Sequence, residues 1–196
     1  MALNQAHQNK QQKMKKRFIF RTITLTMILF AIIFALVMNL TRDKAVISKG
    51  DQAPDFELFQ INSNNEQDYI RLSHLQGKGV VLQFGATYCQ PCEGQLLITE
   101  ALYSDYKDEI EMVSINVDNS ELVIQQFIDK YHLSLPVLHD ARSEIIDLYG
   151  VSPIPHTFFI SPEGKVVDEI VGALTFNELN DHFKEIRPKS ASEGFK

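Results

Sequence analysis

Apolar and polar positions alternate between strand-like and helix-like patterns over most of the chain. Val80–Phe84 is an apolar and β-branched run, as is typical of a buried strand, and a helical pattern follows from about Pro91 to Lys107. The same patterns predict further elements in chain order: strand Glu111–Asp118, helix Ser120–His132 capped by Ser120, strand Leu135–Asp140, helix Arg142–Gly150, strand His156–Ser161, strand Lys165–Gly172 and helix Thr175–Ile186.

This order of elements predicts an α/β fold. Strands alternate with helices, and a hairpin through Pro162–Gly164 followed by a final helix ends the pattern. Such an order favours a mixed central sheet with helices on both faces.

The N-terminal part differs from the rest in hydropathy. Thr22–Thr41 is 20 residues long and carries no charge, and a helix of that length spans about 30 Å, the thickness of a bilayer core. A cleaved signal peptide would have a shorter apolar stretch and a small-x-small cleavage site, neither of which is found here. We therefore predict an uncleaved single-pass membrane anchor.

Charge refines this topology. Residues 1–42 sum to +7 and the remainder sums to −13, within a total of −6. Because basic flanks stay in the cytoplasm, we expect a cytoplasmic N-terminus and the C-terminal domain on the outer face. An acidic body also argues against nucleic-acid binding. The predicted regions are a cytoplasmic basic tail (1–17), a transmembrane anchor (18–41), a linker (42–50), a folded domain (51–187) and a disordered tail (188–196).

The chain has two cysteines, Cys89 and Cys92, in the segment "GATYCQPCEGQ". A disulfide at this spacing closes too small a loop to act as a structural staple. Zinc requires four ligands, and the six histidines show no paired ligand spacing. Redox chemistry is therefore favoured, with no cofactor and no metal expected.

The cysteines lie where a helix is predicted to begin. Pro91 suits the first helical turn, so Cys89 would lie at the helix N-terminus. Exposed N–H groups there favour the thiolate, which is the nucleophile in disulfide exchange. Cys92, three residues further on, could then attack a mixed disulfide and release the substrate.

Four segments carry a family resemblance: "KGDQAPDFEL", "LSHLQGKGVVLQF", "CQPC" and "LYGVSPIPHTFFISPEGKVV". With the basic anchor, they resemble the ResA-type (TlpA/ResA-like) membrane-anchored thiol-disulfide oxidoreductases of the thioredoxin superfamily, over almost the whole chain. The resemblance implies a thioredoxin fold with an N-terminal extension, and reduction of the apocytochrome c disulfide before haem attachment. It also implies a membrane thiol electron donor of the CcdA type.

The resemblance also implies site residues. Cys89 and Cys92 would form the redox-active disulfide, and Pro155 would be a cis-proline that faces them. Residues flanking these positions are expected to support the site: Thr87, Tyr88, Pro91 and Ile154.

Departures from the family pattern affect proton transfer. Gln95 and Gln83 occupy the two positions where ResA-type proteins and thioredoxins carry a carboxylate, and an amide cannot accept a proton in that role. His156, which follows the proline, could supply a proton acceptor or a positive charge near Cys89; the alternative is a solvated histidine beside a groove. Glu93 is expected to be a solvated helix residue.

Three alternatives remain open from the sequence. "GDQAPDFEL" also opens peroxiredoxins, although Leu82 and Ala86 replace the proline and threonine that peroxidases need before the cysteine. The same chemistry could serve other clients, such as sporulation or cell-envelope proteins. Finally, the two glutamines would suit a redox-weak module that binds cysteine-bearing partners without turnover.

Overall fold

The computed structural model describes residues 20–37, 47–61 and 68–188, and the chain divides into two compact units, Met1–Asp43 and Lys44–Lys196. In the first unit, Phe20–Val37 is a helix with a mean hydropathy of 2.3, long and apolar enough to cross a membrane. The Thr24 and Thr26 hydroxyls donate to carbonyls of Arg21 (2.9 Å) and Ile23 (2.8 Å), so their polar groups are bonded within the helix. Several predicted regions lie wholly or partly outside the described residues: the cytoplasmic tail 1–17, residues 18–19 and 38–41 of the anchor, residues 42–46 of the linker, and residues 189–196 of the C-terminal tail.

The second unit is built around one mixed sheet of seven strands, in the order β2-β1-β5-β4-β3-β6-β7. β3, β4 and β5 run parallel, while β6, β7, β1 and β2 pair antiparallel. The strands are β1 Glu57–Ile61, β2 Tyr69–Arg71, β3 Gly79–Gly85, β4 Ile110–Asn116, β5 Val137–His139, β6 His156–Ile160 and β7 Val166–Val171. The helices are η1 Leu72–Leu75, α2 Gln90–Tyr106, α3 Glu121–Tyr131, α4 Glu144–Leu148 and α5 Phe176–Ile186.

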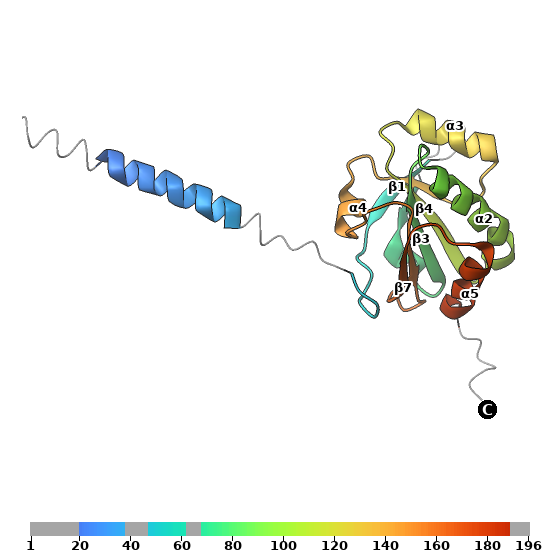
Figure 1. Ribbon diagram of the computed structural model, residues 1–196. Coiled ribbons are helices and arrows are strands. Elements are labelled where there is room, and N and C mark those ends of the chain that lie inside the picture. Colours follow the sequence, from blue (N-terminus) through green and yellow to red (C-terminus); the bar gives the residue numbers. More distant parts are fainter. Residues whose placement is uncertain (1–19, 38–46, 62–67, 189–196) are drawn as a thin grey trace, which may run out of the picture. The chain divides into compact units, whose positions relative to one another are not determined.

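Helices cover both faces of this sheet, as the sequence predicts (Figure 1). On one face, Leu102 of α2 and Phe183 of α5 pack on Val81 and Phe159, and α3 extends this layer through its contact with α2. On the other face, Ile145 of α4 belongs to the cluster around Phe84 and Phe158. The elements predicted from Val80 onward are all found, with boundaries that differ by at most two residues.

The N-terminal edge holds structure that the patterns did not predict. Ile47, expected in the linker, is buried in the core, and the Gly50 amide donates to the Val166 carbonyl at 2.8 Å. β1 then pairs with β5, far away in sequence. The folded unit therefore begins before residue 51.

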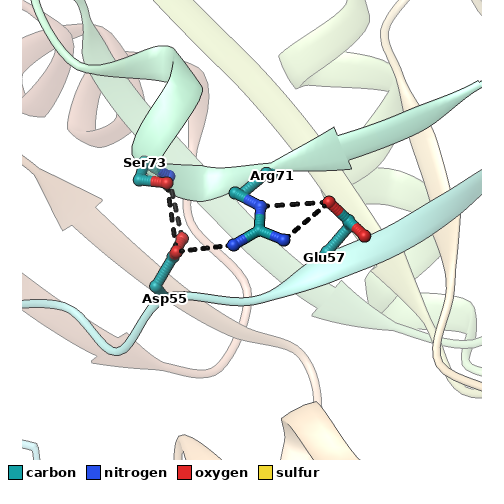
Figure 2. A network of polar contacts seen from close by, with 4 residues as sticks. All are labelled: Asp55, Glu57, Arg71 and Ser73. Atoms are coloured by element: carbon teal, nitrogen blue, oxygen red, sulfur yellow. Dashed lines mark hydrogen bonds and ion pairs between the residues drawn. The ribbon is translucent and has the colours of Figure 1, made fainter.

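Four polar residues hold this edge together (Figure 2). The Asp55 carboxylate accepts the Ser73 amide (2.9 Å) and hydroxyl (3.0 Å), which caps η1 from outside the helix. The Arg71 guanidinium lies 3.0 Å from Glu57 and 3.7 Å from Asp55. These side chains are almost half exposed, so each ion pair contributes little free energy, and together they mainly fix how β1, β2 and η1 meet.

Helix caps differ in part from expectation. Ser120 occupies the N-cap position of α3, but its side chain makes no capping hydrogen bond, so the predicted cap is wrong in that detail. Thr175 instead forms a full capping box with Glu178 at the start of α5. Gly150, with φ +64°, follows α4 in the left-handed conformation that its helix-stop role predicts.

Candidate active site

Cys89 and Cys92 form a disulfide at the start of α2, with their Cα atoms 5.2 Å apart. Cys89 is the N-cap residue, and its Sγ accepts the Cys92 amide at 3.3 Å. Pro91 lies in the first turn, where its missing N–H leaves no bond unmade. The helix N-terminus predicted for Cys89 is therefore confirmed.

The two cysteines differ in access to solvent. Cys89 is half-buried beside Tyr88, which is 75% exposed, whereas Cys92 is only 4% exposed. Gly85, at the end of β3, lies directly behind Cys92: a Cβ on this glycine would lie 3.1 Å from the Cys92 Cβ. A larger residue at position 85 would therefore press on the buried cysteine. The arrangement offers one sulfur to a partner and shields the other.

Gln83 and Gln95, the two family departures, lie together between α2 and the sheet. Gln95 is 1% exposed; its Nε2 donates to the Thr157 hydroxyl at 2.7 Å, and its Oε1 accepts the Leu174 amide at 3.0 Å. The Thr99 hydroxyl lies 3.0 Å from both the Gln83 Oε1 and the Gln95 carbonyl. Both amides are thus bonded inside one buried network, and neither adds charge beneath the disulfide.

A small cavity of about 10 Å³ lies behind Cys92. Its lining includes the polar residues Gln83, Ser114 and Asn116, and its volume is about that needed to hold one water molecule. Glu93 also borders it and accepts a hydrogen bond from the Tyr131 hydroxyl, so Glu93 is half-buried and paired rather than the solvated residue that was expected.

Pro155 precedes β6, and its peptide bond with Ile154 is cis, as is the bond between Ser152 and Pro153. β3 and β6 pair with Phe84 opposite His156, and extending this register by one residue brings Pro155 beside Gly85. Pro155 is buried, while Ile154 is partly exposed. Both therefore lie at the edge of the sheet where the disulfide lies.

His156 is not the solvated histidine that the sequence offered as one alternative. It is only 4% exposed, so it is not solvated, and burial lowers its pKa below the ordinary value of 6.5. It stacks on Phe158, with 4.7 Å between ring centroids. Because side chains alternate along a strand, His156 and Phe158 lie on the face opposite Thr157, and so opposite Gln95 and α2. The position does not favour proton transfer with the cysteines.

His156 is also unusual in its bonding. Neither ring nitrogen has a hydrogen-bond partner among the described residues, and its nearest charged group is the Glu169 carboxylate, 3.8 Å from Nε2. Since that carboxylate is about one-third exposed, it offers a screened ion pair only when the imidazole is protonated.

Asp118 is a site residue that the patterns did not reveal. Its Oδ2 accepts the amide hydrogen of Thr87, in the loop that carries Cys89, at 2.7 Å. The one available signal was a carboxylate at the end of the predicted strand Glu111–Asp118. Among the described residues, no group of three or more His, Cys, Asp or Glu is placed to hold a metal ion.

The sheet is mixed and flanked by helices, and the CxxC disulfide lies at the N-terminus of the helix that follows a central strand. These features define a thioredoxin-fold thiol-disulfide oxidoreductase. Comparison with known proteins agrees. The AhpC/TSA family matches residues 49–169. The chain is 42% identical over 190 residues to "Thiol-disulfide oxidoreductase ResA" of Oceanobacillus iheyensis, covering 96% of this chain and 99% of that one. It is 35% identical to the protein of the same name from Bacillus subtilis, covering 92% and 99%.

Among solved structures, a putative thiol:disulfide interchange protein DsbE from Chlorobium tepidum matches with a TM-score of 0.65 and 27% identity, covering 71% of this chain and 98% of that one. The chain therefore belongs to the AhpC/TSA family and, within it, to the ResA-type thiol-disulfide oxidoreductases. Its activity is thiol-disulfide exchange, and its substrates are disulfide-bearing client proteins.

Proposed function

We propose that this enzyme is anchored in the membrane by residues 18–41 and, on the outer face, reduces client disulfides, with apocytochrome c before haem attachment as the first candidate client. The observation that carries the proposal is the pairing of a half-buried Cys89 with a buried Cys92 at the start of α2. A disulfide that presents only one sulfur to partners suits a reaction in two ordered steps.

In the first step the reduced enzyme attacks. The Cys89 thiolate, stabilised by the N–H groups at the start of α2, attacks one sulfur of the client disulfide. A bond forms between Cys89 and that sulfur, the client disulfide breaks, and the second client sulfur leaves as a thiolate that takes a proton from water. The client now remains attached through a mixed disulfide.

In the second step Cys92 loses its proton and attacks Cys89 Sγ. The mixed disulfide breaks and the Cys89–Cys92 disulfide forms. The client sulfur leaves as a thiolate and takes a proton from water, so the client departs as a dithiol. Two electrons have then passed from the enzyme to the client. A membrane thiol donor, for which the CcdA type is our candidate, would return two electrons to start the next cycle.

The neighbouring residues support these steps in different ways. Tyr88, Ile154 and Pro155 surround the reactive edge and are our candidates for contact with the client, and Thr87 and Pro91 shape the loop and first turn. Gln83 and Gln95 give the buried cluster its shape without providing a base, so we propose that Cys92 loses its proton slowly near neutral pH. His156 acts in this proposal as a buried structural residue.

Trapping tests both the cysteine roles and the client. A Cys92→Ser variant of the full chain, expressed in the native membrane, should hold its client as a mixed disulfide through Cys89, which mass spectrometry can identify. The matched control is the Cys89→Ser, Cys92→Ser double variant, which should hold nothing. Trapped sporulation or cell-envelope proteins without apocytochrome c would overturn the client assignment. If the wild-type enzyme fails to reduce insulin, the protein is a binding module and not a disulfide reductase.

Topology has its own test. The apolar helix Phe20–Val37 and the basic residues that precede it support an outer location for the folded unit. Protease added to intact spheroplasts should digest that unit and spare the anchor. Complete protection of the C-terminal tail, with digestion only after lysis, would contradict this orientation.

A further inference from the structure

We infer that Asp118 is a positioning residue for the reactive cysteine: its carboxylate holds the loop that carries Cys89 at the start of α2. The inference rests on the proposed role of Cys89 as the attacking cysteine. It adds a residue from the loop after β4, outside the CxxC segment and the proline segment, to those that determine reactivity.

The sheet brings the two segments together. β3 and β4 are parallel neighbours, and Gly85 pairs with Asn116 where both strands end, so their loops leave the same edge side by side. The Val117 amide donates to the Gly85 carbonyl at 3.1 Å, and this is the last backbone bond between them. One residue further along, a side chain takes the place of a backbone carbonyl as acceptor: the Asp118 carboxylate accepts the Thr87 amide at 2.7 Å.

This bond lies close to the reactive sulfur along a tightly turned loop. Immediately after Thr87 the chain turns, and the Cys89 amide donates to the Ala86 carbonyl at 3.1 Å. Cys89 then becomes the N-cap, with its Sγ 3.3 Å from the Cys92 nitrogen. Because a carboxylate is a stronger acceptor than a neutral carbonyl, Asp118 fixes Thr87 firmly, and Thr87 sets where the Cys89 sulfur meets the helix N–H groups.

Asp118 is itself held in place from two strands. It is buried; its amide donates to the Asn116 Oδ1 at 2.7 Å, and its carbonyl lies 2.8 Å from the His139 Nε2. A carbonyl only accepts, so His139 carries a hydrogen on Nε2. The other ring nitrogen, Nδ1, lies 3.6 Å from the Glu121 carboxylate. Asp118 is therefore held through both its amide and its carbonyl.

Two substitutions separate the hydrogen bond from the charge. Asp118→Asn keeps an oxygen that can accept the Thr87 amide, and it removes the negative charge. The loss of that charge by itself favours a nearby thiolate, because like charges repel. Asp118→Ala removes both. Positioning therefore predicts opposite outcomes: Asp118→Asn reacts as fast as the parent or faster, and Asp118→Ala reacts more slowly.

The experiment measures the rate of iodoacetamide modification of Cys89 in the full chain, purified in detergent with Cys92→Ser as background. Asp118→Ala should lower the rate at neutral pH by about tenfold, the effect expected from losing one hydrogen bond to a charged group. Asp108→Asn, which removes an exposed carboxylate just before β4, at the opposite end of that strand from Asp118, should leave the rate unchanged. An Asp118→Ala rate equal to the parent's, or an Asp118→Asn rate as low as that of Asp118→Ala, overturns the inference.

A second measurement does not require the alanine variant to fold. In the wild-type chain, the Thr87 amide should exchange slowly with deuterium, and Asp118→Asn should keep most of that protection. Fast exchange of Thr87 in the wild-type chain also overturns the inference. Failure of the proposed cysteine roles would look different, because peptide mapping of the reduced wild-type enzyme would then show Cys92 alkylated before Cys89, whatever residue occupies position 118.

Discussion

His156 and Thr157 are adjacent on β6, both buried and both polar, yet they point to opposite faces of the sheet and lie in opposite environments. Toward α2, the Thr157 hydroxyl accepts from Gln95, which also binds the Leu174 amide. On the far face, the His156 ring lies among aromatic side chains with no hydrogen-bond partner among the described residues. One face beneath the active site is a closed polar network, and the other is an aromatic cluster that contains one unbonded imidazole.

The difference shows what the two glutamines do. A buried carboxylate beneath the disulfide would need to be desolvated. The Gln95 amide bonds instead to Thr157 and Leu174, and the Gln83 amide to Thr99, without burying a charge. On the α2 face, a well-bonded neutral network therefore stands where the family pattern has a proton acceptor. The far face shows the opposite case, since an unbonded buried polar group costs about 1–3 kcal/mol. Three substitutions, from the largest expected effect to the smallest, test this contrast.

The aromatic face should carry more of the stability. Phe158 is fully buried, with ring centroids 5.9 Å from Phe84 and 5.1 Å from Tyr149. Phe158→Ala should lower the free energy of unfolding by about 3–5 kcal/mol, because it removes the ring at the centre of the cluster and leaves a cavity. Urea denaturation measures this, with the half-exposed Phe176→Ala as control. A loss no larger than that of the control would mean that the cluster is not the main support of this face.

On the α2 face, restoring the missing carboxylate should change rate more than stability. In Gln95→Glu the Leu174 amide still has its acceptor, and the Thr157 hydroxyl can rotate to donate to the new oxygen. General base catalysis is worth roughly 10²–10⁴-fold where it operates, so we expect resolution of a mixed disulfide to accelerate by about tenfold or more near neutral pH.

Stopped-flow measurement of that step between pH 6 and 9 provides the test. Burial raises the pKa of the introduced carboxyl, so the gain should appear above that pKa and shrink again at high pH, where the thiol ionises unaided. Gln126→Glu, an exposed amide on α3, is the control. A rate profile that coincides with the wild-type profile would show that the proton of Cys92 passes directly to water.

How far the sequence could anticipate this site depends on the range of each interaction. β3, the start of α2 and the position of Cys89 were predictable, because local hydropathy and a proline determine them. The face of His156 was not: all five residues of β6 are buried, so the strand shows no alternation that would tell one face from the other. Gln95 and Thr157, 62 residues apart, meet only through sheet register. Asp118 and Thr87 meet in the same way, and so do β1 and β5.

The smallest effect should come from removing the unbonded imidazole, and pH reveals it. Burial lowers the pKa of His156 below 6.5, so the folded protein keeps the ring neutral at pH values where the unfolded chain already protonates it. Its contribution to stability is therefore complete above about pH 6.5 and is lost as the pH falls from there toward the folded-state pKa. Glu169 limits this loss, because its carboxylate lies 3.8 Å from Nε2 and favours the charged ring.

His156→Leu should abolish that dependence while keeping an apolar contact with Phe158. At pH 8 the variant should unfold with a free energy equal to that of the wild type or up to about 1 kcal/mol higher, since no unbonded polar atom is then buried. Between pH 7 and 5 its advantage should grow, because only the wild type loses the histidine contribution. His74→Gln, which removes an exposed histidine, should show the same difference in free energy of unfolding between pH 8 and pH 5 as the wild type. Urea denaturation at pH 8 and pH 5 gives all the values, and equal pH slopes for wild type and His156→Leu would mean that the imidazole on the far face is bonded in solution after all.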